Sequence, residues 1–534
     1  MLRLLWTCCV GMLLTPNPLW AQAAGSAQTE SAGPDAIRQQ QPSFLVRAEV
    51  DHATHSYREG DTLAIKVVSE ADAYLYVVYQ QADGKTFQIF PNSVQRDNRV
   101  KARQTVQIPG ENDTFRWIVG PPFGKELVKV IGSKEPLDGL SAEELRRGRF
   151  NPVAPQAIKD LKRVLARKEP VRWAESQIEI LTHPRNQELA TSGVRRVGVF
   201  FGVTKHEVNA EAKEATEGKW EPDHPHNDTS AIAVGRIMQE VGQLNAVRTY
   251  VNEQATRRQL EESITEWLPS VSRPGDTVFI YFCGHGGPIP DDNGDEADGQ
   301  DECLLPYDFV DLGMLAVMNK HRKAGTLDPK LEPRVAQWLE IARKARSVEK
   351  AAAQISAHTG VTDDLFGHWL QRLDGRRVVV ILEMCHSGGF ATQEKGLVDS
   401  QQIKAFDFLD SEVSRLKDIG QRDSALLTAC GSKESAYALR LRDDVRLALE
   451  EAQKRAVEKA VPENMCVMTY YLVESLVADP SPLDLEQVHA HCRAGMKEYF
   501  DTINGLRGKQ GLELLTPHEP LLFNDCVKPV LMKP

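Results

Sequence analysis

The sequence predicts an α/β fold in which a mainly parallel sheet has helices on both faces, preceded by a small β-sandwich. Three buried runs, at 197–203, 276–282 and 378–382, alternate with helical segments, which is the pattern of parallel strands joined by helical crossovers. Upstream, residues 44–133 contain short strand-like runs separated by turn signals such as Glu59-Gly60-Asp61. That pattern is typical of an antiparallel sandwich of roughly the immunoglobulin type.

The composition is that of a soluble globular protein with a sizeable core. Hydrophobic residues make up 41% and charged residues 26% of the 534 residues, a length that suggests roughly two to four domains. The formal net charge of −11 argues against nucleic-acid binding, because attraction to phosphates needs clustered Lys and Arg. No later stretch is apolar for 18 residues, so no membrane span is predicted.

The N-terminus has the organisation of a secretory signal. Arg3 gives the positive start, residues 4–14 form an apolar core too short to cross a membrane, and Ala21-Gln22-Ala23 is a small-x-small cleavage site. We therefore expect residues 1–23 to be a signal peptide and the protein to be exported, to the periplasm or the extracellular space. Residues 24–42 are rich in Ala, Gln, Ser, Gly and Pro, and we expect a disordered tether there.

Residues 43–183 are predicted to be an accessory β-sandwich domain that also contains helical pieces. Its strand-like runs are 62–68, 73–79, 86–91, 127–131 and 171–181, and the helical pieces fall between 141 and 167. It resembles a bacterial accessory domain of unknown function that is often attached to exported enzymes. The resemblance rests on Tyr57-Arg58-Glu59-Gly60-Asp61, Tyr74-Leu75-Tyr76, Phe90-Pro91-Asn92 and Gly120-Pro121-Pro122-Phe123-Gly124. It names no activity, and the partner of this domain is unknown.

Residues 193–528 are predicted to form the second domain. A helix is expected from Asn227 or Asp228 to Glu240, another over 260–268, and a helical insertion over 309–360. Because parallel strands end at one edge of the sheet, side chains that follow them can meet there.

The number of cysteines does not indicate a disulfide scaffold in a chain of this length. Of the nine cysteines, Cys8 and Cys9 belong to the predicted signal peptide, and seven remain. The odd number suits one reduced thiol with a chemical role, and several buried thiols are the alternative. The run Asp223-His224-Pro225-His226 could bind zinc. Because it has no nearby cysteine pair, an ordinary charged loop is the favoured interpretation.

His285 and Cys385 follow two strands of the predicted parallel sheet, and both are flanked by glycine. A Cys–His pair can perform acyl transfer, because the imidazole takes the thiol proton and the thiolate attacks. Gly286 and its neighbours allow close approach of the backbone and leave N–H groups for an oxyanion. A buried cysteine and an unrelated loop histidine are the alternative, which the shared pattern disfavours.

Two motifs resemble those of metacaspases. Phe282-Cys283-Gly284-His285-Gly286, followed by the acidic run 291–302, looks like their histidine motif, and Glu383-Met384-Cys385-His386-Ser387-Gly388 looks like their cysteine motif. The resemblance covers roughly residues 193–525. It implies a caspase-haemoglobinase fold and a cysteine endopeptidase with His285 and Cys385 as its dyad, acting through a thioester acyl-enzyme. The backbone N–H groups of Gly286 and Cys385 are then expected to form the oxyanion hole.

The resemblance also implies a preference for basic residues. Metacaspases commonly carry Asp two residues before the nucleophile, facing the substrate's first pocket, and Glu383 stands there. A second family acid matches Asp228, which could instead be a helix N-cap, or both. Cys283 stands where the family often has Ser, so that pocket wall is altered. We expect protein or peptide substrates with Arg or Lys before the scissile bond.

The acidic run 291–302 contains seven Asp or Glu residues, which suits calcium. Many metacaspases are activated by calcium through an Asp that matches Asp301 and an Asp pair that Asp363-Asp364 resembles. A further family acid is missing, because Thr392 stands at its position. Calcium is therefore expected as a possible activator, with no cofactor required, and a solvated acidic turn is the alternative.

Two other functions remain open. The caspase-like fold could be a non-catalytic scaffold that uses the β-sandwich for binding, although the intact Cys–His pair argues against this. The protein could also be a related thiol hydrolase that acts on non-peptide amides.

Overall fold

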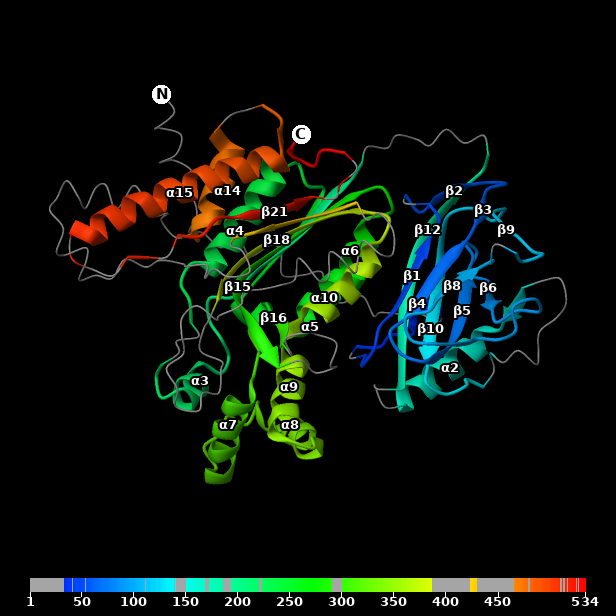
Figure 1. Cartoon of the computed structure of the whole chain (residues 1–534), viewed down its shortest axis with the longest axis horizontal. Helices are drawn as coiled ribbons and strands as arrows, with labels where there is room; N and C mark the ends of the chain where they lie inside the picture. The colour runs from blue at the N-terminus through cyan, green and yellow to red at the C-terminus, as the bar shows by residue number, and fades with distance from the viewer. Residues whose placement is uncertain are drawn as a thin grey trace, which may run out of the picture.

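The computed structural model describes residues 33–534 except 41, 53, 111, 139, 141–149, 169–171, 186–193, 220–222, 291–299, 387–422, 430–464, 479–480, 510, 512–513, 516, 525 and 527. The predicted signal peptide and most of the acidic run lie outside the described residues, as do the side chains of residues 300–302, 385 and 386. Figure 1 shows a β-rich part made by the first third of the chain, coloured blue to cyan, and an α/β part made by the rest.

The β-rich part contains two packed sheets. The smaller has the order β1 (Val46–Val50), β4 (Ile65–Ser69), β8 (Thr105–Ile108). The larger has the order β11 (Asn151–Val153), β6 (Thr86–Phe90), β5 (Ala73–Gln80), β10 (Lys125–Ser133), β12 (Trp173–His183), β2 (Ser56–Arg58), with β7 (Arg99–Val100) on β5. A separate pair joins β3 (Thr62–Leu63) to β9 (Trp117–Ile118). Val46 and Ile65 of the small sheet share a buried core with Val77, Val128 and Ile178 of the large one, as predicted for a sandwich.

The outer face of the larger sheet is covered by helix α2 (Pro155–Arg167) and by residues from the predicted tether. Ile37, just after the short helix η2 (Pro34–Ala36), is 1% exposed and packs in one cluster with Tyr76 and Ile131. Arg38 Nη1 lies 2.6 Å from Glu266 Oε1 of the α/β part. Residues 33–40 thus pack against the sheet through the buried Pro34 and Ile37, and Arg38 adds an ion pair, which differs from the predicted disordered tether.

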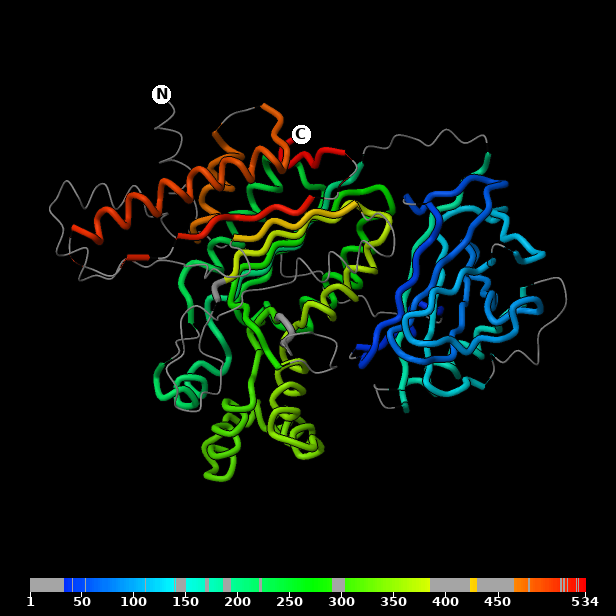
Figure 2. The backbone as a smooth tube through the Cα atoms, in the orientation of Figure 1, coloured from blue at the N-terminus to red at the C-terminus, as the bar shows by residue number. Residues whose placement is uncertain are grey.

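The sheet of the α/β part is mainly parallel. Its order is β14 (Ala246–Val251), β13 (Arg196–Gly202), β15 (Thr277–Pro290), β18 (Arg377–His386), β19 (Ser424–Thr428), β21 (Leu521–Asn524), and only the last pair in this order is antiparallel. β16 (Gln300–Leu305) pairs antiparallel with the end of β15, and β17 (Val361–Thr362) with β16. Figure 2 shows the long central strands running side by side. A small pair joins β20 (Leu483–Asp484) to β22 (Leu531–Lys533).

Helices cover both faces of this sheet, which confirms the predicted fold class. Alternate residues of each central strand face opposite sides. Tyr281 and Ile381 belong to a core with the helices α4 (Asn227–Glu240), α14 (Val467–Ala478) and α15 (Leu485–Lys509). Ile280 and Val380 belong to a core on the other face with α5 (Arg257–Glu262), the π-helical turn η6 (Ser263–Trp267), α6 (Leu268–Val271), α10 (Asp363–Leu370) and η7 (Gln371–Leu373). Short helices α3 (Asn209–Ala215) and η5 (Asn252–Gln254) follow strands of the sheet.

Three helices occupy the predicted insertion: α7 (Leu312–Ala324), α8 (Glu332–Lys344) and α9 (Val348–Thr359). Met314, Val335 and Ile355, one from each helix, share a core of their own, at the bottom of Figure 1. Among the helices of the described residues, none combines the length and the apolar character that a membrane crossing needs.

A buried network of charges joins the two parts. Glu175 of β12 pairs with Arg372 of η7 and, at 2.6 Å, with Lys129 of β10. Burial opposes ionisation of Glu175, but the positive charges of Arg372 and Lys129 outweigh it and lower the pKa to about 2. Arg376 donates to Glu179 Oε2 at 2.6 Å. The β-rich part is thus docked on the α/β part through paired charges.

Candidate active site

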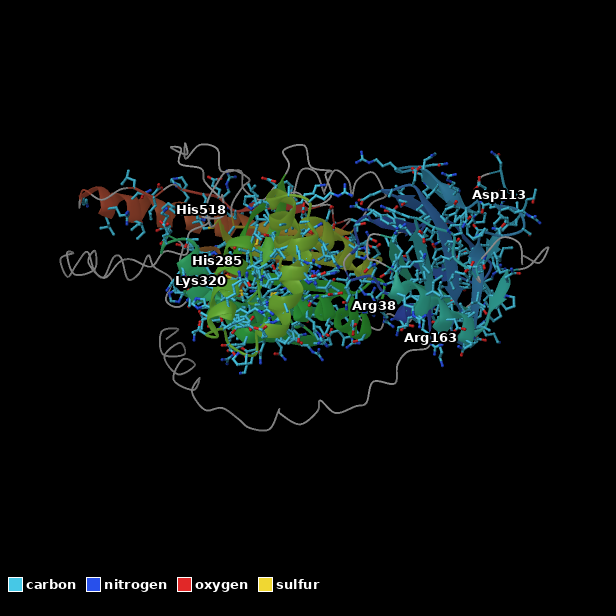
Figure 3. All side chains as sticks on the ribbon, turned by 90° about the horizontal axis from the view of Figure 1, so that it is seen from below. Arg38, Asp113, Arg163, His285, Lys320 and His518 are labelled. Atoms are coloured by element: carbon cyan, nitrogen blue, oxygen red, sulfur yellow. The ribbon has the colours of Figure 1, made fainter. Side chains whose placement is uncertain are left out.

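His285 and Cys385 occupy the same level of two neighbouring strands. β15 and β18 are parallel, and their register pairs Thr277 with Arg377 and continues without a shift to His285 and Cys385. Neighbouring strands lie roughly 4.8 Å apart, so the two backbones are adjacent. His285 is 3% exposed and lies inside the α/β part, whereas Arg38 lies near the junction with the β-rich part (Figure 3). The side chain of Cys385 lies outside the described residues.

The glycines around His285 are part of strand β15, whereas the sequence predicted that this strand ends at residue 282. β13 ends beside Cys283, and β16 then takes over as the neighbour of β15, so β15 continues to Pro290. Gly286 pairs with Leu304 on one side and His386 on the other. A Cβ at Gly286 would lie 2.8 Å from Met384 Sδ, so a larger residue here would displace the Met384 side chain. The role of Gly286 in an oxyanion hole stays a prediction.

Two further histidines surround His285. The ring of His206 lies 5.6 Å from that of His285 between centroids, tilted by 34°, and the ring of His224 lies 5.5 Å away and edge-on. The two segments that carry these histidines are joined by hydrogen bonds from the backbone. The backbone N–H of His206 donates to Asp223 Oδ1 at 3.0 Å, and the backbone N–H of His224 donates to the Thr204 carbonyl at 2.8 Å. Burial lowers the pKa of both imidazoles, that of His206 to about 4, so His285 packs against neutral rings.

Glu383 is buried against the start of helix α14. Its carboxylate accepts hydrogen bonds from the Met468 N–H at 2.8 Å, from the Thr469 N–H at 3.0 Å and from the Thr469 hydroxyl. Tyr281 donates a fourth at 3.5 Å. Burial raises the pKa of Glu383 to about 7, although these donors oppose the shift. The carboxylate thus caps α14 from a neighbouring strand, and its predicted role as selector of basic side chains stays a prediction.

Cys283 lies directly beside Glu383 in the strand register and contacts two polar groups. Its Sγ lies 3.6 Å from Cys466 Sγ and 3.4 Å from Asn227 Oδ1. The Cys466 Sγ lies 3.2 Å from the same Asn227 oxygen. Both thiols are buried. Cys283 therefore contributes to a closed polar cluster with Asn227, Glu383 and Cys466.

Asp228 lies in the first turn of α4 and is not its N-cap. The helix begins at Asn227, and the N-cap position is held by His226, which has a left-handed backbone with φ 76°. Asp228 Oδ1 accepts from the Thr204 hydroxyl at 2.8 Å, and Oδ2 accepts from the Asn252 side chain at 3.0 Å. The carboxylate fastens the loop after β13, at the same edge of the sheet as His206.

The three residues proposed for calcium come from segments that are neighbours. β16 and β17 are antiparallel and pair Cys303 with Thr362, so Asp301 and the pair Asp363-Asp364 flank the same point of the ladder. Asp363 is 1% and Asp364 8% exposed at the start of α10. The side chain of Asp301 lies outside the described residues. Buried carboxylates here are the hard oxygen donors that calcium prefers.

The sequence reasoning missed His206, Cys466 and Thr469. His206 could have been found, because it follows the strand that ends at Gly202 by the same rule that singled out His285. Cys466 and Thr469 are distant from Glu383 in the chain, and no local pattern marks their contact.

Comparison with known families agrees with the motifs. Residues 235–329 match the model of the metacaspase, peptidase C14 domain, which includes His285 and ends before Cys385. Residues 56–136 match a domain of unknown function, DUF4384. The resemblance to metacaspases and the resemblance to an accessory domain of unknown function are thereby confirmed.

Several curated metacaspases share a short segment with this chain. Metacaspase-1 of Coccidioides immitis is 45% identical over 56 residues, which is 10% of this chain and 12% of that protein. Metacaspase-1A of Aspergillus fumigatus is 43% identical over 56 residues, 10% and 14% of the two chains. The match thus spans about an eighth of these relatives. A solved Geobacter sulfurreducens protein aligns with 62% of this chain and 92% of its own at 14% identity, with a TM-score of 0.34, too low to support an argument.

Proposed function

We propose that this chain, which carries a metacaspase peptidase C14 domain, is a caspase-like cysteine endopeptidase that cuts proteins after Arg or Lys. The observation that carries the proposal is the register of β15 and β18, which pairs His285 with Cys385. An imidazole beside a thiol is what thiol-based acyl transfer needs.

The reaction begins when His285 takes the thiol proton of Cys385 and the thiolate attacks the carbonyl carbon of the scissile bond. Backbone N–H groups near Gly286 and Cys385 hold the oxyanion of the tetrahedral intermediate. His285 then gives its proton to the leaving amine, which leaves a thioester on Cys385. Water, deprotonated by His285, hydrolyses the thioester and restores the thiol.

The surroundings of His285 support this role. The ring is buried between the neutral rings of His206 and His224, which hold its orientation and limit access of water. A fixed imidazole loses less entropy when it aligns with the thiol, and it needs less rearrangement during proton transfer.

Two carboxylates support the preference for a basic side chain. Glu383 precedes Cys385 by two residues on β18. Asp228 lies in the first turn of α4, whose Asn227 contacts Cys283, the strand partner of Glu383. Carboxylates bind a guanidinium through paired charge-assisted hydrogen bonds, so Arg is expected to be preferred to Lys. A basic side chain that reaches Glu383 would share the carboxylate with the N–H groups of α14.

Calcium activation and export are the other parts of the proposal. Asp301, Asp363 and Asp364 would hold the ion, whose charge would offset the clustered carboxylates and fix the start of α10 relative to β16. The charged, apolar and small-residue order of residues 1–23 supports export. Calcium titration of the activity and N-terminal sequencing of protein secreted by a bacterial host test these two parts.

The main test compares hydrolysis of peptide amides with Arg, Lys or Asp before the scissile bond, with calcium and with a chelator. We expect cleavage after Arg and Lys, a loss of activity in Cys385→Ala, and labelling of Cys385 by a thiol-directed peptide probe ahead of the buried Cys303 and Cys492. Cleavage only after Asp would overturn the assignment of Glu383. Full activity of Cys385→Ala would overturn the nucleophile, and failure to label Cys385 selectively would favour a non-catalytic scaffold.

A further inference from the structure

Four side chains from four segments converge on one buried point, which lies two residues before His285 and Cys385 along their strands. They are Asn227 of α4, Cys283 of β15, Glu383 of β18 and Cys466, which immediately precedes α14. Ligand atoms of the two cysteines and Glu383 all lie within 4.8 Å of one another. The cysteines are 0% and 3% exposed, and Glu383 is 6% exposed.

The spacing of the donor atoms matches a tetrahedral metal site. Around zinc, metal–sulfur bonds of about 2.3 Å and metal–oxygen bonds of about 2.0 Å put two sulfurs roughly 3.8 Å apart and a sulfur and an oxygen roughly 3.5 Å apart. Here the two sulfurs are 3.6 Å apart, and Asn227 Oδ1 lies 3.4 Å from Cys283 Sγ and 3.2 Å from Cys466 Sγ. These three atoms therefore form a triangle that resembles one face of a zinc tetrahedron.

The orientation of the two oxygen donors fits the same site. The Asn227 amide nitrogen donates to the Val203 carbonyl at 2.7 Å, which turns Oδ1 towards the sulfurs. Glu383 Oε1 accepts one hydrogen bond, from the Met468 N–H, and so keeps a lone pair for a ligand bond. Among the described residues, no ion pair with Lys or Arg is made by Glu383.

We propose that Cys283, Cys466, Glu383 and Asn227 form a zinc site behind the dyad. Two thiolates favour zinc over calcium or magnesium, which prefer oxygen donors only. On binding, zinc takes the place of the two thiol protons, which pass to the solvent, and the sulfurs each form a bond to the metal. The closed set of four protein ligands is that of a structural site with no position for water.

A metal bound here would hold β15, β18 and the start of α14 in fixed positions beside the dyad. Cys283 precedes His285 by two residues, Glu383 precedes Cys385 by two, and Cys466 holds the start of α14. In the zinc-bound form Glu383 is a metal ligand, so we expect this form to lose its preference for Arg and Lys. That last expectation rests on the proposed function, whereas the metal site does not.

The test uses the full chain with the change Cys385→Ala, which removes the dyad thiol as a competing ligand and makes the readout independent of activity. After equilibration with zinc and removal of excess metal, elemental analysis is expected to find about one zinc per chain. Cys466→Ser in the same background is expected to lower this at least tenfold. Cys492→Ser is the matched control, because Cys492 is also buried, packs in the same core and is outside the cluster.

A second measurement does not depend on the folding of a variant. Cobalt bound to the unaltered cluster is expected to give the near-ultraviolet absorption of thiolate-to-cobalt charge transfer, and zinc is expected to remove it. No stoichiometric zinc together with no such absorption would overturn the proposal. So would an intact mass lower by two hydrogens, with a disulfide mapped to Cys283 and Cys466, because oxidised sulfurs cannot ligate the metal. Equal zinc loss in the Cys492→Ser control would overturn the assignment of ligands.

Discussion

Two buried polar clusters among the described residues differ in how their charges are compensated. At the junction of the two parts, Glu175 lies between Lys129 and Arg372, and Arg376 pairs with Glu179. At the strand ends, Glu383 is also buried, but its partners are N–H and hydroxyl groups. The pKa of Glu175 is lowered to about 2, whereas burial raises that of Glu383 to about 7.

This difference suits two roles: the junction cluster around Glu175 holds the two parts together, whereas the cluster around Glu383 suits a functional site. Fully paired charges satisfy each other and fix one geometry, and removal of one partner leaves the others buried without compensation. An acid held only by neutral donors keeps a perturbed pKa, and such groups concentrate at functional sites. The predictions below test whether the junction cluster governs stability and the strand-end cluster governs activity.

The largest effect is expected at the dyad. His285→Ala should lower kcat/KM by roughly 10²–10⁴-fold, because the proton transfers lose their base and acid. The urea midpoint should change far less than the activity. Peptide-amide kinetics and urea unfolding check this, with the partly exposed His321, which pairs with Glu214, changed to Ala as the control that should keep both. Normal kinetics in the His285→Ala variant would show that His285 takes no part in the mechanism.

At the junction, Glu175→Gln should lower the free energy of unfolding by about 3–5 kcal/mol, because Arg372 and Lys129 are left as buried charges without an anion. Peptidase kinetics measured well below the new melting temperature should stay near those of the parent. Urea unfolding measures the change. Glu135→Gln, which removes exposed ion pairs with Lys168 and Arg172, is the control and should give no measurable shift. Equal effects in both variants would contradict a special role of the junction.

Acid should weaken the junction next, because His368 of α10 interacts electrostatically with Glu175, Arg372 and Lys129. Burial is the main cause that lowers the pKa of His368 to about 4, against an ordinary value of 6.5. As the pH falls, His368 is therefore protonated in the unfolded chain before it is protonated in the folded chain. Its contribution to the free energy of unfolding is complete above pH 6.5 and is lost as the pH drops towards 4, by at most about 3 kcal/mol. The change His368→Asn should flatten this part of the curve of unfolding free energy against pH. An unchanged slope in the variant would show that His368 is not the group that titrates.

In metal-free protein, the ionisation of Glu383 should have the opposite effect on stability: the free energy of unfolding should fall as the pH rises. Its folded pKa, about 7, is above its ordinary value of 4.5, so the folded state holds this proton more tightly. Its contribution to stability is full below pH 4.5 and is lost as the pH rises through 7. The change Glu383→Gln should remove this decline, measured by urea unfolding between pH 5 and 8 with a chelator. Persistence of the decline in the variant would contradict the assignment.

Much of the fold could be predicted because it depends on local patterns. The runs Val378–Leu382 and Val197–Val203 are continuous and apolar, which marks buried strands, and the His285 and Cys385 motifs stand directly after such runs. The extension of β15 through its glycines could not be predicted, because it depends on pairing with β16. The capping of α14 by Glu383 is likewise a contact between distant segments.

The smallest effect is expected at His224, whose ring lies edge-on to His285 at 5.5 Å. The change His224→Phe keeps a flat ring but removes its nitrogen atoms. We expect kcat/KM to fall by less than about tenfold and the acidic limb of its pH profile to shift, because the field around His285 changes while its packing is kept. His224→Ala should cost more, since it also admits water. A loss above 100-fold in the Phe variant would mean that His224 itself moves a proton, and an unshifted pH profile would reduce its role to packing.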